Sequence, residues 1–282
     1  MRAIRVRGIE RRSPVNSHGR TLRAIRTGIL GLSALAAGSV LSAEAPATVR
    51  DLLSDVLHRP PAENIFVIPV AGHVVGVNGN EFRTDVTIST AATTRVAVAW
   101  IAQDADNSAR PLSFFDIGPG PAFFENMVES SLHETGLGAL VVAALAPDGT
   151  VDAAARISGS ARIWTEAAGC PGTSSLAGRP GRFGIGYAIG YGLKLGTGHR
   201  INLGFINPNP VAISIHVFAG GELDVVVPPF SMRQVPVPEP DASSPDGSVF
   251  VGSYSAVGND FAGYAVSVDQ VSGDGWLVNL SE

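Results

Sequence analysis

The chain has 282 residues, a formal net charge of −5, 45% hydrophobic residues and a single cysteine. This length allows two domains of ordinary size, and one cysteine excludes a disulfide within the chain. The acidic balance argues against nucleic acid as a partner, because a negative surface repels phosphate groups.

Residues 1–45 are predicted to be a secretory signal peptide. Eight arginines come first, the apolar run Gly28–Leu41 follows, and the small residues of Ser42–Ala47 come next. This order is typical of such a signal, and an apolar run of about 14 residues is short for a membrane span. We expect cleavage after Ala43 or Ala47 and no stable membrane insertion afterwards, with an uncleaved anchor or an amphipathic arm as the alternative.

Cleavage would make the remaining chain more acidic. Residues 1–45 contain eight Arg and two Glu and carry +6, which leaves −11 on residues 46–282. We therefore expect a secreted protein, extracellular or at the cell surface, with the periplasm as an alternative. Its unknown partner would be a protein or a glycan and not nucleic acid.

Segment 46–63 is predicted to contain a short helix and a linker. The helix is expected at Val49–Leu57, because Thr48 occupies a capping position and Asp51 follows three residues later. Few other helix signals occur, apart from one helical turn around Asn126–His133.

Alternation with a period of two predicts strands in residues 64–168. In Phe82–Ile88 the apolar side chains alternate with polar ones, as in a half-buried strand, and Val96–Trp100 alternates likewise. The connection Ser89–Arg95 between them has the length of a hairpin loop. Further strands are expected at Leu112–Ile117, Gly138–Ala143 and Ala155–Thr165.

Residues 169–282 repeat this pattern. An offset of 117 aligns Asn64–Ala102 with Gly181–Ala219 without a gap, and six of the 39 pairs are identical. The identical pairs are Phe66/Phe183, Ile68/Ile185, Ala71/Ala188, Gly79/Gly196, Arg83/Arg200 and Ala102/Ala219. A turn-like segment around Cys170 separates the copies. The later strands are expected at Gly184–Gly192, Leu223–Val227, Ser248–Val251, Gly263–Val268 and Trp276–Leu280, with Val235–Pro240 as an extended sheet edge.

Short strands separated by Gly and Pro turns are typical of β-sandwiches. The chain is therefore predicted to be all-β. We expect two tandem antiparallel, immunoglobulin-like β-sandwich domains after the signal peptide, in residues 64–168 and 169–282.

The sequence contains none of the common catalytic motifs. It has no Gly-x-Ser-x-Gly elbow, no His-Glu-x-x-His pair and no P-loop, and Gly184–Gly190 departs from the dinucleotide-binding spacing. We therefore predict no enzyme, no catalytic residue, no cofactor and no metal site. The acidic loops Asp241–Asp246 and Asp269–Asp274 are interpreted as turns, with calcium binding as the alternative.

Trp164 and Arg162 are the candidate ligand-binding residues. Trp164 is offset from its apolar neighbour Ile163, and Arg162 shares the face of Trp164. Trp100 shares a face with Val96 and Val98, and Trp276 shares a face with Val278 and Leu280, so both are expected in the core.

Four segments resemble secreted proteins of environmental bacteria that contain tandem immunoglobulin-like sandwiches. The segments are Gly79–Ile88, His199–Pro208, Val227–Val235 and Tyr264–Asp274. The resemblance covers most of residues 64–282 and implies the sandwich fold without any active residue. We expect a non-enzymatic protein of cell-surface or extracellular interaction. The alternatives are a carbohydrate-binding accessory module and an exported hydrolase with an unrecognised site.

Overall fold

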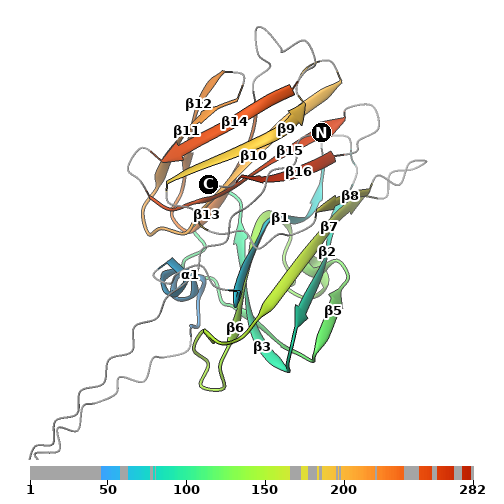
Figure 1. The fold of residues 1–282 in the computed structure, drawn as a ribbon, viewed down its shortest axis with the longest axis vertical. Coiled ribbons are helices and arrows are strands. Elements are labelled where there is room, and N and C mark those ends of the chain that lie inside the picture. Colours follow the sequence, from blue (N-terminus) through green and yellow to red (C-terminus); the bar gives the residue numbers. More distant parts are fainter. Residues whose placement is uncertain are drawn as a thin grey trace, which may run out of the picture. The chain divides into compact units, whose positions relative to one another are not determined.

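Antiparallel β-strands dominate the computed structural model of this protein (Figure 1). The model describes residues 46–57, 63–76, 79, 81–165, 173–176, 183, 186–194, 196, 198–219, 221–237, 248–255, 259–269 and 275–280. The expected signal peptide lies outside the described residues. Within them, no helix is both long and apolar enough to cross a membrane.

Helix α1 (Val49–Leu57) precedes the strands, and its start is capped as the sequence predicts. The backbone N–H of Asp51 donates to Thr48 Oγ1 over 3.3 Å, and the N–H of Thr48 donates to Asp51 Oδ2 over 3.0 Å. This reciprocal pair is a capping box, which satisfies backbone donors that have no partner inside the helix.

The first eight strands form two four-stranded layers. The first layer has the order β4-β3-β6-β1 and the second the order β5-β2-β7-β8. They are joined at one corner, where the end of β1 pairs with the start of β2. The elements are β1 (Ile65–Val75), β2 (Glu81–Thr90), β3 (Thr94–Ala102), β4 (Ser113–Ile117), β5 (Gly120–Phe124), α2 (Met127–Ser130), β6 (Gly136–Leu145), β7 (Ile157–Thr165) and β8 (Thr173–Leu176).

The second eight strands pair in the same order. Their layers are β12-β11-β14-β9 and β13-β10-β15-β16, so that adding eight to each strand number of the first set gives the second. The strands are β9 (Tyr187–Lys194), β10 (His199–Asn207), β11 (Ile213–Phe218), β12 (Glu222–Val227), β13 (Ser231–Pro236), β14 (Ser248–Ser255), β15 (Ala262–Asp269) and β16 (Gly275–Leu280). Of the extended segment expected at Val235–Pro240, Val235 and Pro236 belong to an edge strand, β13, and residues 238–240 lie outside the described residues.

The connection Ser89–Arg95 crosses from one layer to the other. β2 pairs with β5 and β7, whereas β3 pairs with β4 and β6. A loop of hairpin length therefore does not form a hairpin here. Its length is set by the gap between two packed sheets, which is about 10 Å.

Each pair of layers encloses its own apolar core. In the first, Phe66 of β1, Ile88 of β2 and Trp100 of β3 belong to one buried cluster, as Trp100 was expected to do. In the second, Phe205 of β10 and Ile215 of β11 belong to another. Both clusters consist of the inward side chains of alternating strands, which is how sandwich-like layers bury their surface.

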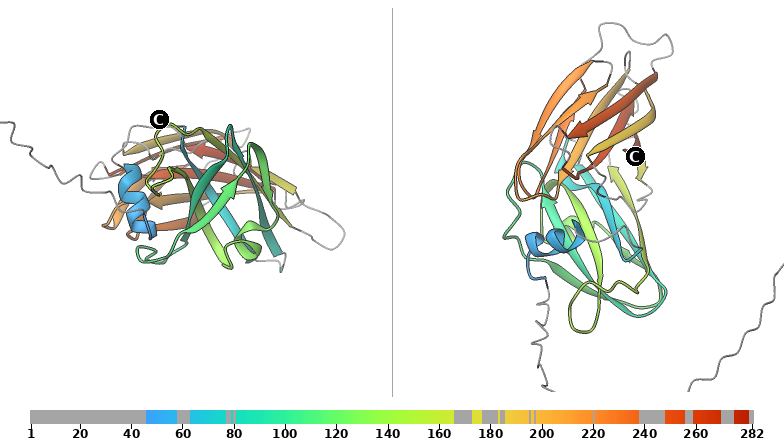
Figure 2. Two further views of the ribbon diagram at one scale, coloured as in Figure 1. Left: turned by 90° about the horizontal axis from the view of Figure 1, so that it is seen from below. Right: turned by 60° about the vertical axis from the view of Figure 1, so that its left-hand side comes forward.

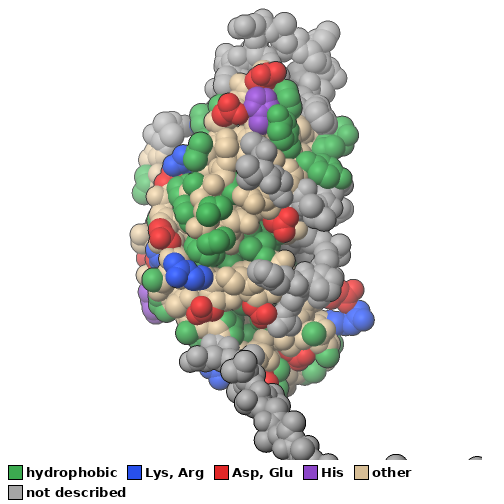
Figure 3. Space-filling model, turned by 90° about the vertical axis from the view of Figure 1, so that its left-hand side faces the viewer, with side chains coloured by type: hydrophobic (Ala, Val, Ile, Leu, Met, Phe, Trp, Pro, Cys, Tyr) green, Lys and Arg blue, Asp and Glu red, His purple; other side chains and the backbone are tan. Residues whose placement is uncertain are grey.

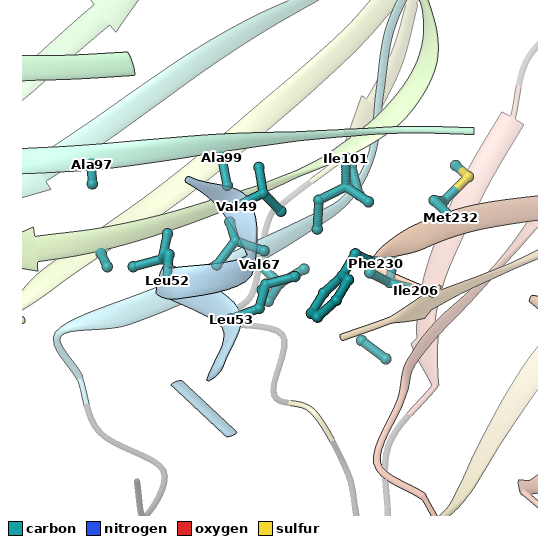
Figure 4. Close-up of a cluster of buried hydrophobic side chains, with 14 of the residues drawn as sticks. Val49, Leu52, Leu53, Val67, Ala97, Ala99, Ile101, Ile206, Phe230 and Met232 are labelled. Atoms are coloured by element: carbon teal, nitrogen blue, oxygen red, sulfur yellow. The ribbon is translucent and has the colours of Figure 1, made fainter. Parts of the chain in front are cut away.

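A third apolar cluster lies outside both cores (Figure 4). It covers the outer face of β3, β6 and β1, so that these strands are buried on both faces. The cover includes Val49, Leu52 and Leu53 of α1, together with Phe230 just before β13 and Met232 within it. Figure 2 shows α1 lying against these strands. Small residues such as Ala97 and Ala99 on this outer face allow the close approach.

Polar contacts accompany this third cluster. The N–H of Asp104 donates to the carbonyl of Met232 over 2.8 Å, and Asn107 Nδ2 donates to the carbonyl of Phe230 over 2.9 Å. Arg233 Nε donates to Asp104 Oδ1 over 2.6 Å. The loop that follows β3 is thus bonded directly to the start of β13.

Candidate ligand-binding face

Trp164 and Arg162 lie on the outer face of the layer β5-β2-β7-β8, as alternation along β7 predicts. Their partners across the strand pair are Arg83 and Asp85 respectively. Arg162 is exposed, but Trp164 is only half-exposed, and the guanidinium of Arg83 lies 5.4 Å from its ring centroid. The indole N–H of Trp164 is buried without a hydrogen-bond partner among the described residues. One face of Trp164 is therefore already covered by a cation, so the ring offers less free surface than an open platform.

A charged cluster adjoins this pair at the corner between β1 and β2. His73 Nε2 lies 2.8 Å from Glu81 Oε1, and His73 Nδ1 lies 3.2 Å from Glu129 Oε2. The hydrogen bond and positive charge of Arg83, together with His73, hold the pKa of the Glu81 carboxyl below its usual value. The two carboxylates stand at opposite nitrogens of one imidazole, so they cannot share an ion beside it. No group of three or more His, Cys, Asp or Glu side chains among the described residues could hold a metal ion.

A different surface collects exposed aromatic rings, namely the outer face of β12-β11-β14-β9. The exposed fractions are 49% for Tyr187 of β9, 41% for Phe218 of β11 and 43% for Tyr254 of β14. Strand β11 alternates strictly between buried and outward residues, and this alternation turns His216 and Phe218 outward. We call the set Tyr187, His216, Phe218, Tyr254, Glu222 and Asp224 the ring face.

Strand register arranges the ring face in two rows. Asp224, His216, Tyr254 and Tyr187 are successive cross-strand partners on β12, β11, β14 and β9. With strands about 4.8 Å apart, this row spans about 14 Å. Glu222 and Phe218 begin the second row, two residues along their strands.

Three aromatic side chains of the ring face, His216, Phe218 and Tyr254, lie close together. The centroid of the His216 ring lies 4.8 Å from that of Phe218 and 5.4 Å from that of Tyr254. The Phe218 and Tyr254 rings are inclined by only 27°, with centroids 6.2 Å apart. These rings are therefore neighbours that stand on two adjacent strands, β11 and β14, of one sheet.

The acidic residues of β12 orient His216. Its Nδ1 lies 2.7 Å from Asp224 Oδ1, within hydrogen-bond distance, and its Nε2 lies 3.8 Å from Glu222 Oε2. An Nδ1–H donated to Asp224 leaves Nε2 directed toward Glu222 and solvent. Figure 3 shows a histidine beside acidic and hydrophobic side chains on the side of the molecule where β11 and β12 lie.

Sequence reasoning recognised only part of this surface. The outward direction of His216 follows from its alternation with Ile215 and Val217. Tyr254 was missed because the expected strand ended at Val251, whereas β14 continues to Ser255. The Gly residues around Tyr187 give its strand no clear alternation, so the sequence does not show that its ring is exposed.

Other sequence expectations had different outcomes. Trp276 was expected in the core, but its side chain is half-exposed and its indole N–H donates to the carbonyl of Gly192 over 3.1 Å. Cys170 and most of the two acidic loops lie outside the described residues. Comparison with models of protein families and with curated proteins finds no match to this chain.

Proposed function

We propose that this chain is a secreted, non-enzymatic binding protein that acts outside the cell or at its surface. It would consist of a signal peptide followed by two tandem immunoglobulin-like β-sandwich domains. The observation that carries the proposal is the ring face. Phe218 and Tyr254 are adjacent and both exposed, so they leave apolar surface in water that a bound partner would cover.

The strand order supports the immunoglobulin-like assignment in its central part. β2 pairs with β5, and β4, β3 and β6 lie side by side, as strands B and E and strands C′, C and F do in variable-type domains. The outer strands differ. β1 lies beside β6, where strand G stands in an immunoglobulin domain, and β7 lies beside β2, where strand A stands. The second eight strands have the same order, with β9 in the place of strand G and β15 in the place of strand A, which supports a tandem repeat of one unit.

Export is tested with the full chain produced in a secreting bacterium. We expect the protein recovered outside the cytoplasm to begin near residue 44 or 48, as read by intact mass. A recovered protein that retains residues 1–45, or retention of the whole product in the cytoplasm, would contradict the proposal.

Binding is tested with the exported protein, labelled and applied to intact cells of the producing strain. We expect retention on the cells that is lost in the triple variant Tyr187→Ser, Phe218→Ser, Tyr254→Ser. The matched control removes two exposed apolar side chains elsewhere, Val75→Ser and Phe123→Ser. Equal retention of the wild type and the triple variant would overturn the role of the ring face.

A further inference from the structure

We infer that the ring face binds an uncharged carbohydrate chain, an inference that rests on the proposed binding role of this face. Tyr187, Phe218 and Tyr254 form the stacking surface, and the His216–Asp224 pair forms the hydrogen-bonding end of the row. Four observations carry the assignment: the ring geometry, the polar end, the size of the patch and its charge.

The ring geometry fits the apolar face of a sugar. One side of a pyranose ring presents C–H groups, and these are attracted to the negative face of an aromatic ring. The Phe218 and Tyr254 rings are stacked, with planes inclined by 27° and centroids 6.2 Å apart, so they form one aromatic unit against which a sugar ring can lie. The rings stand on three strands of one sheet, so little freedom is lost when the ligand binds.

The polar groups at the end of the row suit hydroxyl groups. The carboxylates of Asp224 and Glu222 are largely exposed and accept hydrogen bonds, and the phenol of Tyr254 both donates and accepts. Asp224 already holds His216 in a fixed orientation over 2.7 Å, so the imidazole does not have to be ordered by the ligand. This combination of donors and acceptors beside rings distinguishes a hydroxyl-rich ligand from a purely apolar one.

The size of the patch favours a short glycan segment over a folded protein. The row spans about 14 Å across four strands, and the second row adds about 7 Å along them. The ring face contains six side chains, whereas each side of a standard protein interface contributes about 20–30 residues. A patch of this size accommodates a few sugar rings.

The charge of the surface selects against acidic glycans. β11, β12 and β14 contain no Lys or Arg, β9 contains Lys194 at its end, and β12 contributes Glu222 and Asp224 to the face. Residues 46–282 carry −11 as a whole. A sulfated or uronic chain would be repelled, so the ligand is expected to be neutral.

The ligand class is tested on cells to which the exported protein is applied. Periodate cleaves vicinal diols of sugars, and protease removes surface proteins. We expect periodate-treated cells to lose retention and protease-treated cells to keep it. If protease abolishes retention and periodate leaves it unchanged, this inference fails while the proposed binding function stands. If retention never depended on the ring face, both fail.

Polysaccharides of known composition test the inferred ligand class directly. Affinity electrophoresis with hydroxyethylcellulose, glucomannan and starch is compared with carboxymethylcellulose as the anionic counterpart. We expect retardation by at least one neutral polymer, weakened about tenfold or more by Phe218→Ala or Tyr254→Ala. Tyr254→Phe and Asp224→Asn should cause smaller losses, and Phe123→Ala should cause none. Retardation by the anionic polymer alone, or concentration-dependent dimerisation that Phe218→Ala abolishes, would overturn the inference.

Discussion

The ring of Tyr264 lies directly across Gly204. The two residues are partners on β15 and β10, and Gln234 is the partner of Gly204 on the other side, on β13. The fully buried Tyr264 ring crosses above the glycine and donates its hydroxyl to Gln234 Oε1 over 2.7 Å. Glycine is required here because any Cβ at position 204 would overlap the ring.

Gly204→Ala is therefore expected to destabilise the fold by about 1–3 kcal/mol, the usual cost of overpacking a core. The displaced ring belongs to the cluster that holds α1 and β13 against β3 and β6. Denaturant unfolding of the exported protein measures the loss. Gly118→Ala is the control, because a Cβ there meets nothing within 4 Å. Equal midpoints for the two variants would contradict the packing argument.

Stability is expected to fall at alkaline pH because of Tyr264. Burial raises the pKa of its hydroxyl above the ordinary tyrosine value of 10.0. A group whose pKa is higher in the folded state than in the unfolded state contributes its full stabilisation below the unfolded-state pKa. This stabilisation is lost as the pH rises above about 10. Chemical unfolding between pH 8 and 11 should show a downward slope above pH 10 that is reduced in Tyr264→Phe. An unchanged slope in the variant would refute this origin.

The elements that sequence analysis predicted well are those with a local signal. β2 and β3 alternate, and α1 has its capping residues, so each could be placed within a few residues. β5 and β8 were missed. One begins with Gly-Pro, which reads as a turn, and the other is Thr-Ser-Ser-Leu, which has no apolar period. Such strands form because neighbouring strands offer hydrogen bonds, and not because of their own pattern.

The local sequence pattern does not show which strands pair or which outer faces of the sheets are covered. Alternation tells which residues share a face but not which strand lies beside which, so the crossing between β2 and β3 could not be predicted. Ala97 and Ala99 are buried by α1 and the second set of strands, and small residues give no hint of such a cover. Tyr187, His216 and Tyr254 form one row only because three strands distant in sequence pair in register.

Asn107 is expected to be the most sensitive polar residue at the junction of the two strand sets. Its side chain is fully buried, and its Nδ2 lies within 3.0 Å of the carbonyl oxygens of Ala102, Ala105 and Phe230. Asn107→Ala would leave these acceptors without their donor, at a cost of about 2–3 kcal/mol. Thermal unfolding compares it with Thr94→Ala, which removes one exposed hydrogen bond to the carbonyl of Ala92. A shift no larger than that of Thr94→Ala would refute the role of Asn107.

The capping box of α1 is expected to make stability depend on pH in the acid range. Hydrogen bonds from Thr48 hold the pKa of Asp51 below its ordinary value of 3.8, with backbone N–H groups and the charge of Arg50 contributing. A lowered folded pKa means that the contribution is present above pH 3.8 and is lost as the pH falls through the folded value. Thr48→Ala should cost about 1 kcal/mol at pH 7, the usual loss for an N-cap.

The variant Asp51→Asn distinguishes the contribution of the capping box from general acid unfolding of the protein. At pH 7 Thr48→Ala and Asp51→Asn should both unfold at lower denaturant than the wild type, because α1 covers the outer cluster through Val49, Leu52 and Leu53. As the pH falls below 3.8, the stabilisation by the charged form of Asp51 is progressively lost, and the difference between the wild type and Asp51→Asn should shrink. Asp148→Asn is the matched control, since Asp148 accepts a similar hydrogen bond from Thr150 in an exposed turn that covers no core. A difference for Asp51→Asn that stays constant from pH 7 to pH 3 would show that the carboxylate does not stabilise the helix through its charge.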